Sequence, residues 1–360
     1  MEDASLMVRV LGNASFGNMS NVETDDSSLL SSHAAEVFDM LVLYIFMAGI
    51  TSTLELETLR DRIKSPKGLI VGTLAQYAFL PPIGYGVSLL FELSVPQTVG
   101  LVAICCCPGG SGSNILCRMF KADVALSIAL TGLSSFLAFA LLPLNLNLYL
   151  QGTSGDFELD PWGLSKFTLV IVSGTLTGLL VKKYSSILFL KFTQRIASVC
   201  IVYLLIHSIA LNATSTTPFW TLPVGVIVAV CTPVVCGHIF GFGVSVLWKL
   251  EKSSAAAVAL EVSVQNKFLA LGLVGVIFND VDDANIAKGV PLLYGGFAAL
   301  FNVCMLSIYW KLGYTEMPDG SPFYAPLYNL MLTDNANHEA KVAQSPVDTT
   351  PKVTEQTNVG

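Results

Sequence analysis

The sequence PGGSGSN at residues 108–114 lies in the middle of an apolar stretch, residues 96–120. Proline removes a backbone donor, and glycine favours leaving the helix. A single proline would make a tolerated kink, whereas this run of helix breakers predicts a true break. Unwound backbone at membrane depth is tolerated only where it is buried in protein or lines a cavity. The stretch therefore predicts a discontinuous transmembrane helix.

A second apolar stretch, residues 254–278, contains EVSVQNK at residues 261–267. A charge at the centre of a membrane helix costs about 2.5–3.5 kcal/mol on translocon scales, so an ionisable residue there predicts a functional site. The structural alternative is that Glu261 and Lys267 partner each other for helix packing. Position favours the functional interpretation, because the two interrupted stretches occupy matching places in two halves of the chain.

The rest of the chain has the composition of a membrane protein. Of its 360 residues, 53% are hydrophobic and 12% charged, and the mean hydropathy is +0.64. Globular domains carry about 25% charged residues. About 20 apolar residues cross the ~30 Å hydrocarbon layer, which predicts an all-α polytopic membrane protein with nine transmembrane helices. The predicted spans are residues 34–54, 68–91, 96–120, 123–150, 162–182, 192–211, 219–248, 254–278 and 286–314.

The distribution of basic residues predicts the orientation, because lysine and arginine favour the cytosolic side. Of the 19 lysines and arginines, 15 fall on one side of the predicted spans, together with the C-terminus. This places the N-terminal segment, residues 1–33, outside the cell, and the tail, residues 315–360, in the cytosol, where its composition predicts disorder. Asn13 and Asn18 begin sequons in the outer segment and are candidate glycosylation sites. The net charge of −7 argues against a nucleic-acid partner.

Oxygen-bearing side chains gather around the two interruptions. Paired broken helices in inverted repeats are a recurrent design of secondary transporters, and hard cations such as sodium prefer oxygen ligands. Serine and threonine in membrane helices are more often packing contacts, but their combination with a carboxylate and amides predicts a sodium site. The candidate ligands are Ser113, Asn114, Ser127, Thr131, Glu261 and Gln265.

These motifs resemble those of the sodium/bile acid symporter family. The matching segments are CCPGG and SN within residues 106–114, ALSIALT at residues 125–131 and E..VQN at residues 261–266. The resemblance covers roughly residues 40–312, including IKSPKGLIVGTLAQYAFLPP before and within the second predicted span.

The resemblance implies a core of residues 68–150 and 219–314, a panel of residues 34–54 and 162–211, and two crossing broken helices. It implies two sodium sites and a substrate between core and panel. The first sodium would be held by Ser113, Asn114, Ser127, Thr131 and Glu261. The second would be held by the side chains of Gln76, Glu261 and Gln265 and the carbonyls of Val262 and Val264. Substrate would lie near Asn266 and Pro108, Gly109 and Gly110.

Two residues depart from the pattern of the bile acid carriers. Ala298 stands where they have a glutamine, which puts bile salt as the substrate in doubt. Lys267 follows the QN pair where they have a small or uncharged residue. Three roles are open for Lys267: binding a substrate carboxylate or sulfonate, pairing with Glu261 when no ion is bound, or extending to an aqueous cavity.

We therefore expect a sodium-coupled symporter in the plasma membrane that imports an amphipathic organic anion, such as a bile acid or sulfated steroid. A carrier of a small carboxylate is one alternative. A non-transporting receptor or scaffold of the same fold is another, although its sodium ligands would be expected to have eroded. An enzyme is disfavoured because GxSxG, HExxH and Walker motifs are lacking.

Overall fold

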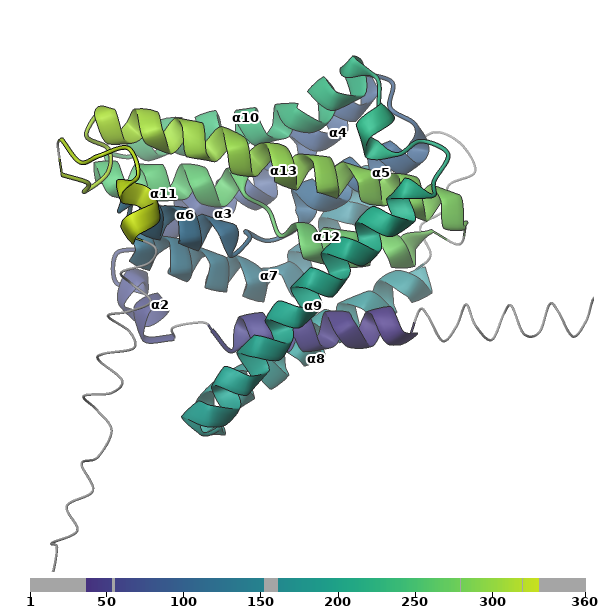
Figure 1. Cartoon of the computed structure of the whole chain (residues 1–360), viewed down its shortest axis with the longest axis horizontal. Coiled ribbons are helices and arrows are strands. Elements are labelled where there is room, and N and C mark those ends of the chain that lie inside the picture. The colour runs from purple at the N-terminus through teal and green to yellow at the C-terminus, as the bar shows by residue number, and fades with distance from the viewer. Residues whose placement is uncertain (1–36, 54–55, 152–160, 279, 319, 330–360) are drawn as a thin grey trace, which may run out of the picture.

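A computed structural model describes residues 37–53, 56–151, 161–278, 280–318 and 320–329. The predicted all-α fold is confirmed, since regular structure in these ranges is helical throughout (Figure 1). The predicted N-terminal segment with Asn13 and Asn18, and the tail from residue 330 onward, lie outside the described residues.

The helices follow the predicted spans closely. The first is Val37–Thr51. The others are α2 (Leu56–Ile63), α3 (Lys67–Leu74), a π-helix (Ala75–Phe79), α4 (Leu80–Leu90), α5 (Val95–Cys106), α6 (Gly112–Phe120), α7 (Val124–Leu150), α8 (Pro161–Tyr184), α9 (Ile187–Ala213), a 3₁₀ turn (Phe219–Thr221), α10 (Val224–Leu247), α11 (Lys252–Ser263), α12 (Lys267–Ile277) and α13 (Val281–Lys311).

Five of these helices are long and apolar enough to cross a membrane: α7, α8, α9, α10 and α13. Several others are segments of interrupted spans, because α5 is followed by α6 and α11 by α12 with only a short break between them. Each predicted span thus contains a helix or consecutive helical segments. The total of nine transmembrane helices stays a prediction.

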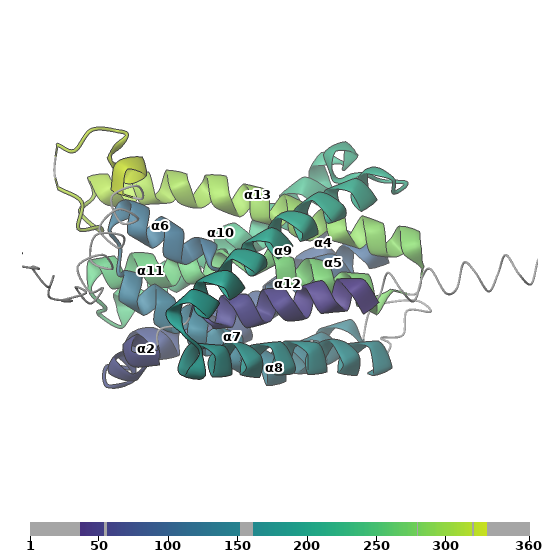
Figure 2. The ribbon, with the colours of Figure 1, turned by 60° about the horizontal axis from the view of Figure 1, so that its bottom comes forward.

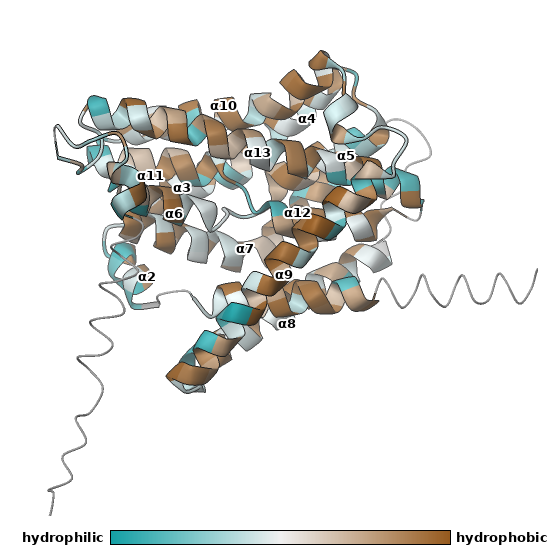
Figure 3. Ribbon diagram, viewed as in Figure 1, coloured by the Kyte–Doolittle hydropathy of each residue, from teal (hydrophilic) through white to brown (hydrophobic). Residues whose placement is uncertain are grey.

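Exposed apolar side chains cover the outer helices, as a lipid-facing surface requires. Figure 3 shows apolar residues along α8, α9 and α10. Leu169 and Leu180 on α8, Val199 on α9, and Ile239 and Leu247 on α10 are each more than half exposed. A soluble protein rarely exposes so much contiguous apolar surface.

The first helix packs against α8 and α9 through glycines. Its Gly49 lies against Ala197 of α9, and Gly174 and Gly178 of α8 lie against the backbone and side chains of the first helix. Tyr44 and Thr177 share a hydrogen bond of 2.7 Å. These three helices lie together along one side of the remaining bundle in Figures 1 and 2.

The other helices pack around α5 and α11, whose side chains are almost completely buried. Contacts join α5 to α4, α7, α12 and α13, and join α11 to α3, α6, α7, α10 and α13. The two broken helices therefore run through the interior, and their breaks are shielded from lipid by neighbouring helices.

Two segments differ from the prediction. The last predicted span begins at residue 286, whereas α13 begins at Val281, and Asp280 caps the helix by accepting a hydrogen bond of 2.9 Å from the Asp283 amide. The beginning of the tail was expected to be disordered. Met317 is instead buried among Tyr309 and Trp310, and Asn329 donates a hydrogen bond of 3.1 Å to the Met119 carbonyl.

Candidate functional site

The breaks of the two discontinuous helices lie against each other and pair through their backbones. The Gly110 amide donates to the Val264 carbonyl at 2.8 Å, and the Asn266 amide donates to the Pro108 carbonyl at 2.9 Å. Gly109 and Gln265 form an isolated antiparallel bridge at the same place. Backbone groups freed by a break must be satisfied inside the protein. Here the backbone groups of each break form hydrogen bonds with backbone groups of the other.

Glycine is required at this crossing because there is no room for a side chain. A Cβ on Gly109 would overlap the Glu261 carboxylate, and a Cβ on Gly110 would lie 2.8 Å from the Gln265 carbonyl oxygen. The consecutive glycines therefore do more than break the helix. They bring the backbone of one break into contact with the carboxylate and backbone of the other.

The carboxylate of Glu261 is completely buried beside this crossing. Ser113 donates a hydrogen bond of 2.6 Å to its Oε2, and Thr131 donates one of 2.8 Å to its Oε1. The Ser127 hydroxyl lies 3.4 Å from Oε2. Within the described part of the chain, no lysine, arginine or histidine forms an ion pair with Glu261. Its hydroxyl partners are neutral, so its negative charge is not balanced by protein.

Asn114 completes the group of five residues predicted for the first sodium. Its side-chain oxygen accepts a hydrogen bond of 2.8 Å from Ser127. Ser127 and Thr131 lie one turn apart on α7, and Ser113 and Asn114 lie in the first turn of α6. The structure thus brings all five together from α6, α7 and α11.

The residues predicted for the second sodium also meet. Gln76 donates to the Gln265 side-chain oxygen at 3.2 Å, and Gln265 donates to the Val262 carbonyl at 2.7 Å. Gln76 is completely buried in the π-helix, and its own side-chain oxygen has no hydrogen-bond partner. π-helical turns often occur at functional sites. The Val264 carbonyl is less available, since it already accepts from Gly110.

The candidate substrate residues lie around the start of α12. Asn266 caps this helix, its side-chain oxygen accepting from the Leu269 amide at 3.2 Å. The stem of Lys267 extends across Gly295 of α13, where a Cβ would overlap it. The Lys267 ammonium lies 5.3 Å from the centre of the Phe268 ring. Lys267 forms no ion pair with Glu261, whose carboxylate accepts hydrogen bonds from Ser113 and Thr131. Ala298 is buried on α13.

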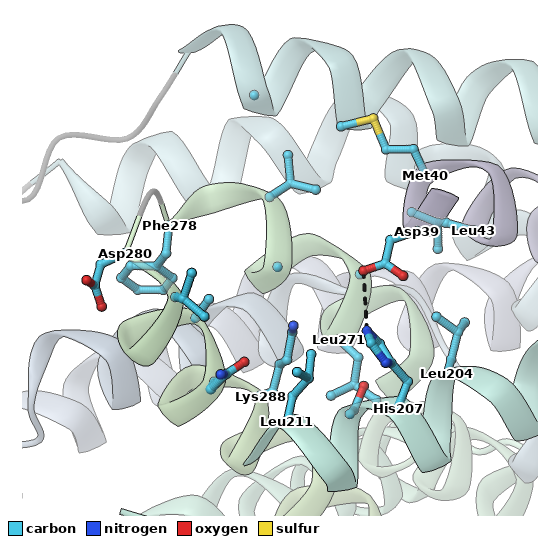
Figure 4. A pocket seen from close by; sticks show the side chains of 18 of the residues that line it. Asp39, Met40, Leu43, Leu204, His207, Leu211, Leu271, Phe278, Asp280 and Lys288 are labelled. Carbon is cyan, nitrogen blue, oxygen red and sulfur yellow. Dashed lines mark ion pairs between the residues drawn. The ribbon is translucent and has the colours of Figure 1, made fainter. Parts of the chain in front are cut away.

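A cavity of about 410 Å³ separates the first helix, α8 and α9 from α12 and α13. Figure 4 shows Asp39 and His207 on one side of it, Lys288 projecting from α13, and Phe278 and Asp280 beside the end of α12. Leu271, which also lines it, is one helical turn beyond Lys267. The cavity therefore reaches to within a turn of the candidate substrate residues.

Three residues behind the crossing, Ser134, Asn302 and Tyr309, were missed by sequence reasoning. Ser134 accepts a hydrogen bond of 3.3 Å from the Gly109 amide. Asn302 accepts from Ser263 at 2.9 Å and bonds His238 at 2.8 Å, and His238 also bonds Tyr309 at 2.8 Å. Ser134 follows Ser127 and Thr131 at helical spacing, a signal that could have revealed it. Asn302 is the one amide side chain within the predicted span 286–314, which could also have been noticed.

Comparison with known proteins shows similarity to one family. Residues 40–201 match the family model described as Sodium Bile acid symporter family. This is the family whose motifs the two broken helices resemble. The family match covers the first broken helix, and the relatives described next extend the similarity over most of the chain.

Relatives in the family come from plants, bacteria and mammals. The rice "Probable sodium/metabolite cotransporter BASS1, chloroplastic" is 32% identical over 74% of this chain and 62% of its own length. The Bacillus subtilis "Uncharacterized sodium-dependent transporter YocS" is 25% identical over 78% of this chain and 85% of its own. The mouse "Ileal sodium/bile acid cotransporter" is 28% identical over 80% of this chain and 82% of its own length. This chain spans less than two thirds of the rice protein. All three relatives are named as transporters and none as an enzyme.

Proposed function

We propose that the chain is a sodium-coupled symporter that imports an amphipathic organic anion by alternating access. The observation that carries this proposal is the buried carboxylate of Glu261, surrounded by hydroxyls at the crossing of two broken helices. An uncompensated buried charge is expensive unless it is paired or binds an ion. A bound cation would balance it.

The ligand set favours a monovalent cation. One carboxylate with hydroxyl and amide oxygens suits a hard ion of charge +1, whereas calcium sites usually combine several carboxylates. Among the described residues, no group of three or more histidine, cysteine, aspartate or glutamate side chains could hold a metal. The names of the plant, bacterial and mammalian relatives all refer to sodium. Sodium is therefore the proposed co-transported ion.

Two sodium sites are proposed. The first comprises Ser113, Asn114, Ser127, Thr131 and Glu261, which already form one hydrogen-bonded group. The second comprises Gln76, Gln265, Glu261 and the carbonyls of Val262 and Val264. Its support is the unpartnered buried oxygen of Gln76, because a buried acceptor left without a partner costs free energy that an ion would recover.

Sodium binding at this crossing would couple to substrate through the backbone. The sodium ligands and the proposed substrate residues, Pro108, Gly109, Gly110, Asn266 and Lys267, belong to the same two breaks. An ion held by Glu261 would fix the breaks against each other and so prepare the substrate site. Movement of the core against the panel (the first helix, α8 and α9) would then alternate access, as in other broken-helix transporters.

The substrate is proposed to lie between core and panel, with its anionic group near Lys267. The relatives' names include both bile acid and metabolite cotransporters, so a small carboxylate is the second candidate. The absence of a glutamine at Ala298 is the feature that favours it. We further propose a plasma-membrane protein with an outer N-terminus and a cytosolic C-terminus, as the basic residues predict.

Uptake of radiolabelled taurocholate by cells expressing the chain tests this proposal. Uptake in sodium buffer should exceed uptake in choline buffer at least about tenfold, because both sodium sites must fill before the substrate site forms. Equal uptake in the two buffers would contradict sodium coupling. If the protein is at the cell surface and no taurocholate enters, bile salt is excluded, and sulfated steroids and small carboxylates are assayed in the same way.

A further inference from the structure

The cavity between the first helix, α8, α9, α12 and α13 contains a charged residue that the sodium and substrate proposals do not use. Lys288 lies in the second turn of α13 and is 8% exposed. Its ammonium forms no hydrogen bond or ion pair with any residue that the structure describes. Its side chain projects into the cavity in Figure 4. A buried, unpaired cation aimed into a cavity predicts an anionic ligand.

The stem of Lys288 is positioned by its neighbour across the cavity wall. A Cβ on Gly275 of α12 would lie 3.3 Å from Lys288 Cε and 3.6 Å from its Nζ. Glycine at position 275 therefore leaves room for the ammonium beside α12. In the same manner, Lys267 of α12 extends to Gly295 of α13. The helix pair α12 and α13 therefore carries both lysines.

The two acids that line the cavity, Asp39 and Asp280, form hydrogen bonds with other groups. Asp39 accepts a hydrogen bond of 3.1 Å from Tyr203 and lies 3.7 Å from His207. Asp280 accepts from the Asp283 amide at 2.9 Å and lies at the rim. Asp39 attracts the Lys288 ammonium electrostatically, but among the described residues no ion pair joins the two groups. The ammonium therefore lacks a direct anionic contact, which an anionic ligand would supply.

The remaining walls are largely apolar. Leu43, Leu204, Leu211, Leu271 and Phe278 line the same cavity. A ligand with one anionic group and an apolar body would match both features, because its charge would meet Lys288 while its body removed apolar surface from water. About 410 Å³ is within the range of small-molecule sites.

We propose that Lys288 binds the carboxylate or sulfonate of an amphipathic organic anion at an outer station of the transport pathway. This inference rests on the proposed function, which gives the direction of substrate movement. The cavity leads from the outer ends of α12 and α13 toward Lys267. Lys267 packs against Gly295, which is seven residues after Lys288 on α13. Lys288 packs against Gly275, which is eight residues after Lys267 on α12. At 1.5 Å per residue the two lysines are about 11 Å apart along the helix pair. An anion released from Lys288 would therefore next meet Lys267.

The test measures thermal unfolding of the purified full chain in lipid nanodiscs, with octanesulfonate as the anionic probe and octyltrimethylammonium as its cationic match. Octanesulfonate should raise the wild-type Tm in a saturable manner, and the cation should not. Lys288→Met should weaken the octanesulfonate effect at least about 30-fold in apparent affinity, as expected when one partner of a buried charge pair is removed. Lys288→Arg should restore much of it.

Two controls separate this inference from the proposed function. Lys288→Met should not lower the Tm without probe, because an unpaired buried charge is replaced by an apolar side chain of similar length. Stabilisation by sodium should persist in Lys288→Met and disappear in Glu261→Gln. Equal effects of octanesulfonate on wild type and Lys288→Met, or none on wild type, would overturn the role of Lys288. Loss of sodium stabilisation in wild type would instead contradict the proposed function.

Discussion

Replacing Glu261 with glutamine is expected to lower the apparent sodium affinity at least about 100-fold and to abolish sodium-dependent uptake. Glutamine has nearly the same shape, and its amide oxygen can still accept a hydrogen bond from Thr131 or Ser113. The change therefore removes the charge while leaving most of the packing. Losing one partner of a buried charge pair costs about 3–5 kcal/mol, and 1.4 kcal/mol is a factor of ten.

The measurement is the sodium concentration that gives half-maximal thermal stabilisation, at constant ionic strength with potassium as the replacement. Asp61→Asn is the matched control, because it also removes one carboxylate charge, but at an exposed ion pair with Lys64. Asp61→Asn should keep the wild-type sodium response. A wild-type response in Glu261→Gln would remove this carboxylate from the sodium site.

Gly109→Ala is expected to prevent the two breaks from pairing. Its methyl group would overlap the Glu261 carboxylate, which is itself fixed by Ser113 and Thr131. Overpacking of this kind costs roughly 1–3 kcal/mol of folding free energy. We expect a lower Tm and no detectable sodium stabilisation, because the carboxylate and the Gly109–Gln265 bridge cannot both keep their places.

Gly243→Ala on α10 is the control for this change. A Cβ at Gly243 would have no atom within 4 Å, and alanine is the better helix former. Gly243→Ala should therefore leave the Tm equal or higher, with sodium stabilisation unchanged. Normal sodium stabilisation in Gly109→Ala would show that the close approach of this glycine to Glu261 is unnecessary for the site.

The helix breaks could be predicted from sequence because their signals are local. Proline and glycine at residues 108–112 follow the end of α5, and residues 264–266 separate α11 from α12. A charge inside an apolar stretch is equally visible, which identified Glu261 and Lys267. Lys288 gives the same signal inside the last predicted span and could have been singled out by the same argument.

The pairing of these segments could not be predicted from composition or spacing. The bridge between Gly109 and Gln265 joins residues far apart in the chain, and its geometry depends on how the surrounding helices pack. The contact of Ser134 with Gly109, the π-helix that holds Gln76, and the cavity around Lys288 are likewise tertiary properties. Resemblance to a known family supplied Gln76 and the Val262 and Val264 carbonyls, which the residues alone did not suggest. The inverted repeats and the orientation stay predictions.

Sodium is proposed to bind at the crossing of the broken helices. Equilibrium binding of radioactive sodium-22 to the purified chain, in a potassium background, tests it most directly because no transported substrate need be known. Binding should be saturable and approach two ions per chain, and Glu261→Gln should abolish it, because both proposed sites use this carboxylate. Binding that potassium displaces as readily as unlabelled sodium, or no saturable binding by the folded wild-type chain, would contradict it.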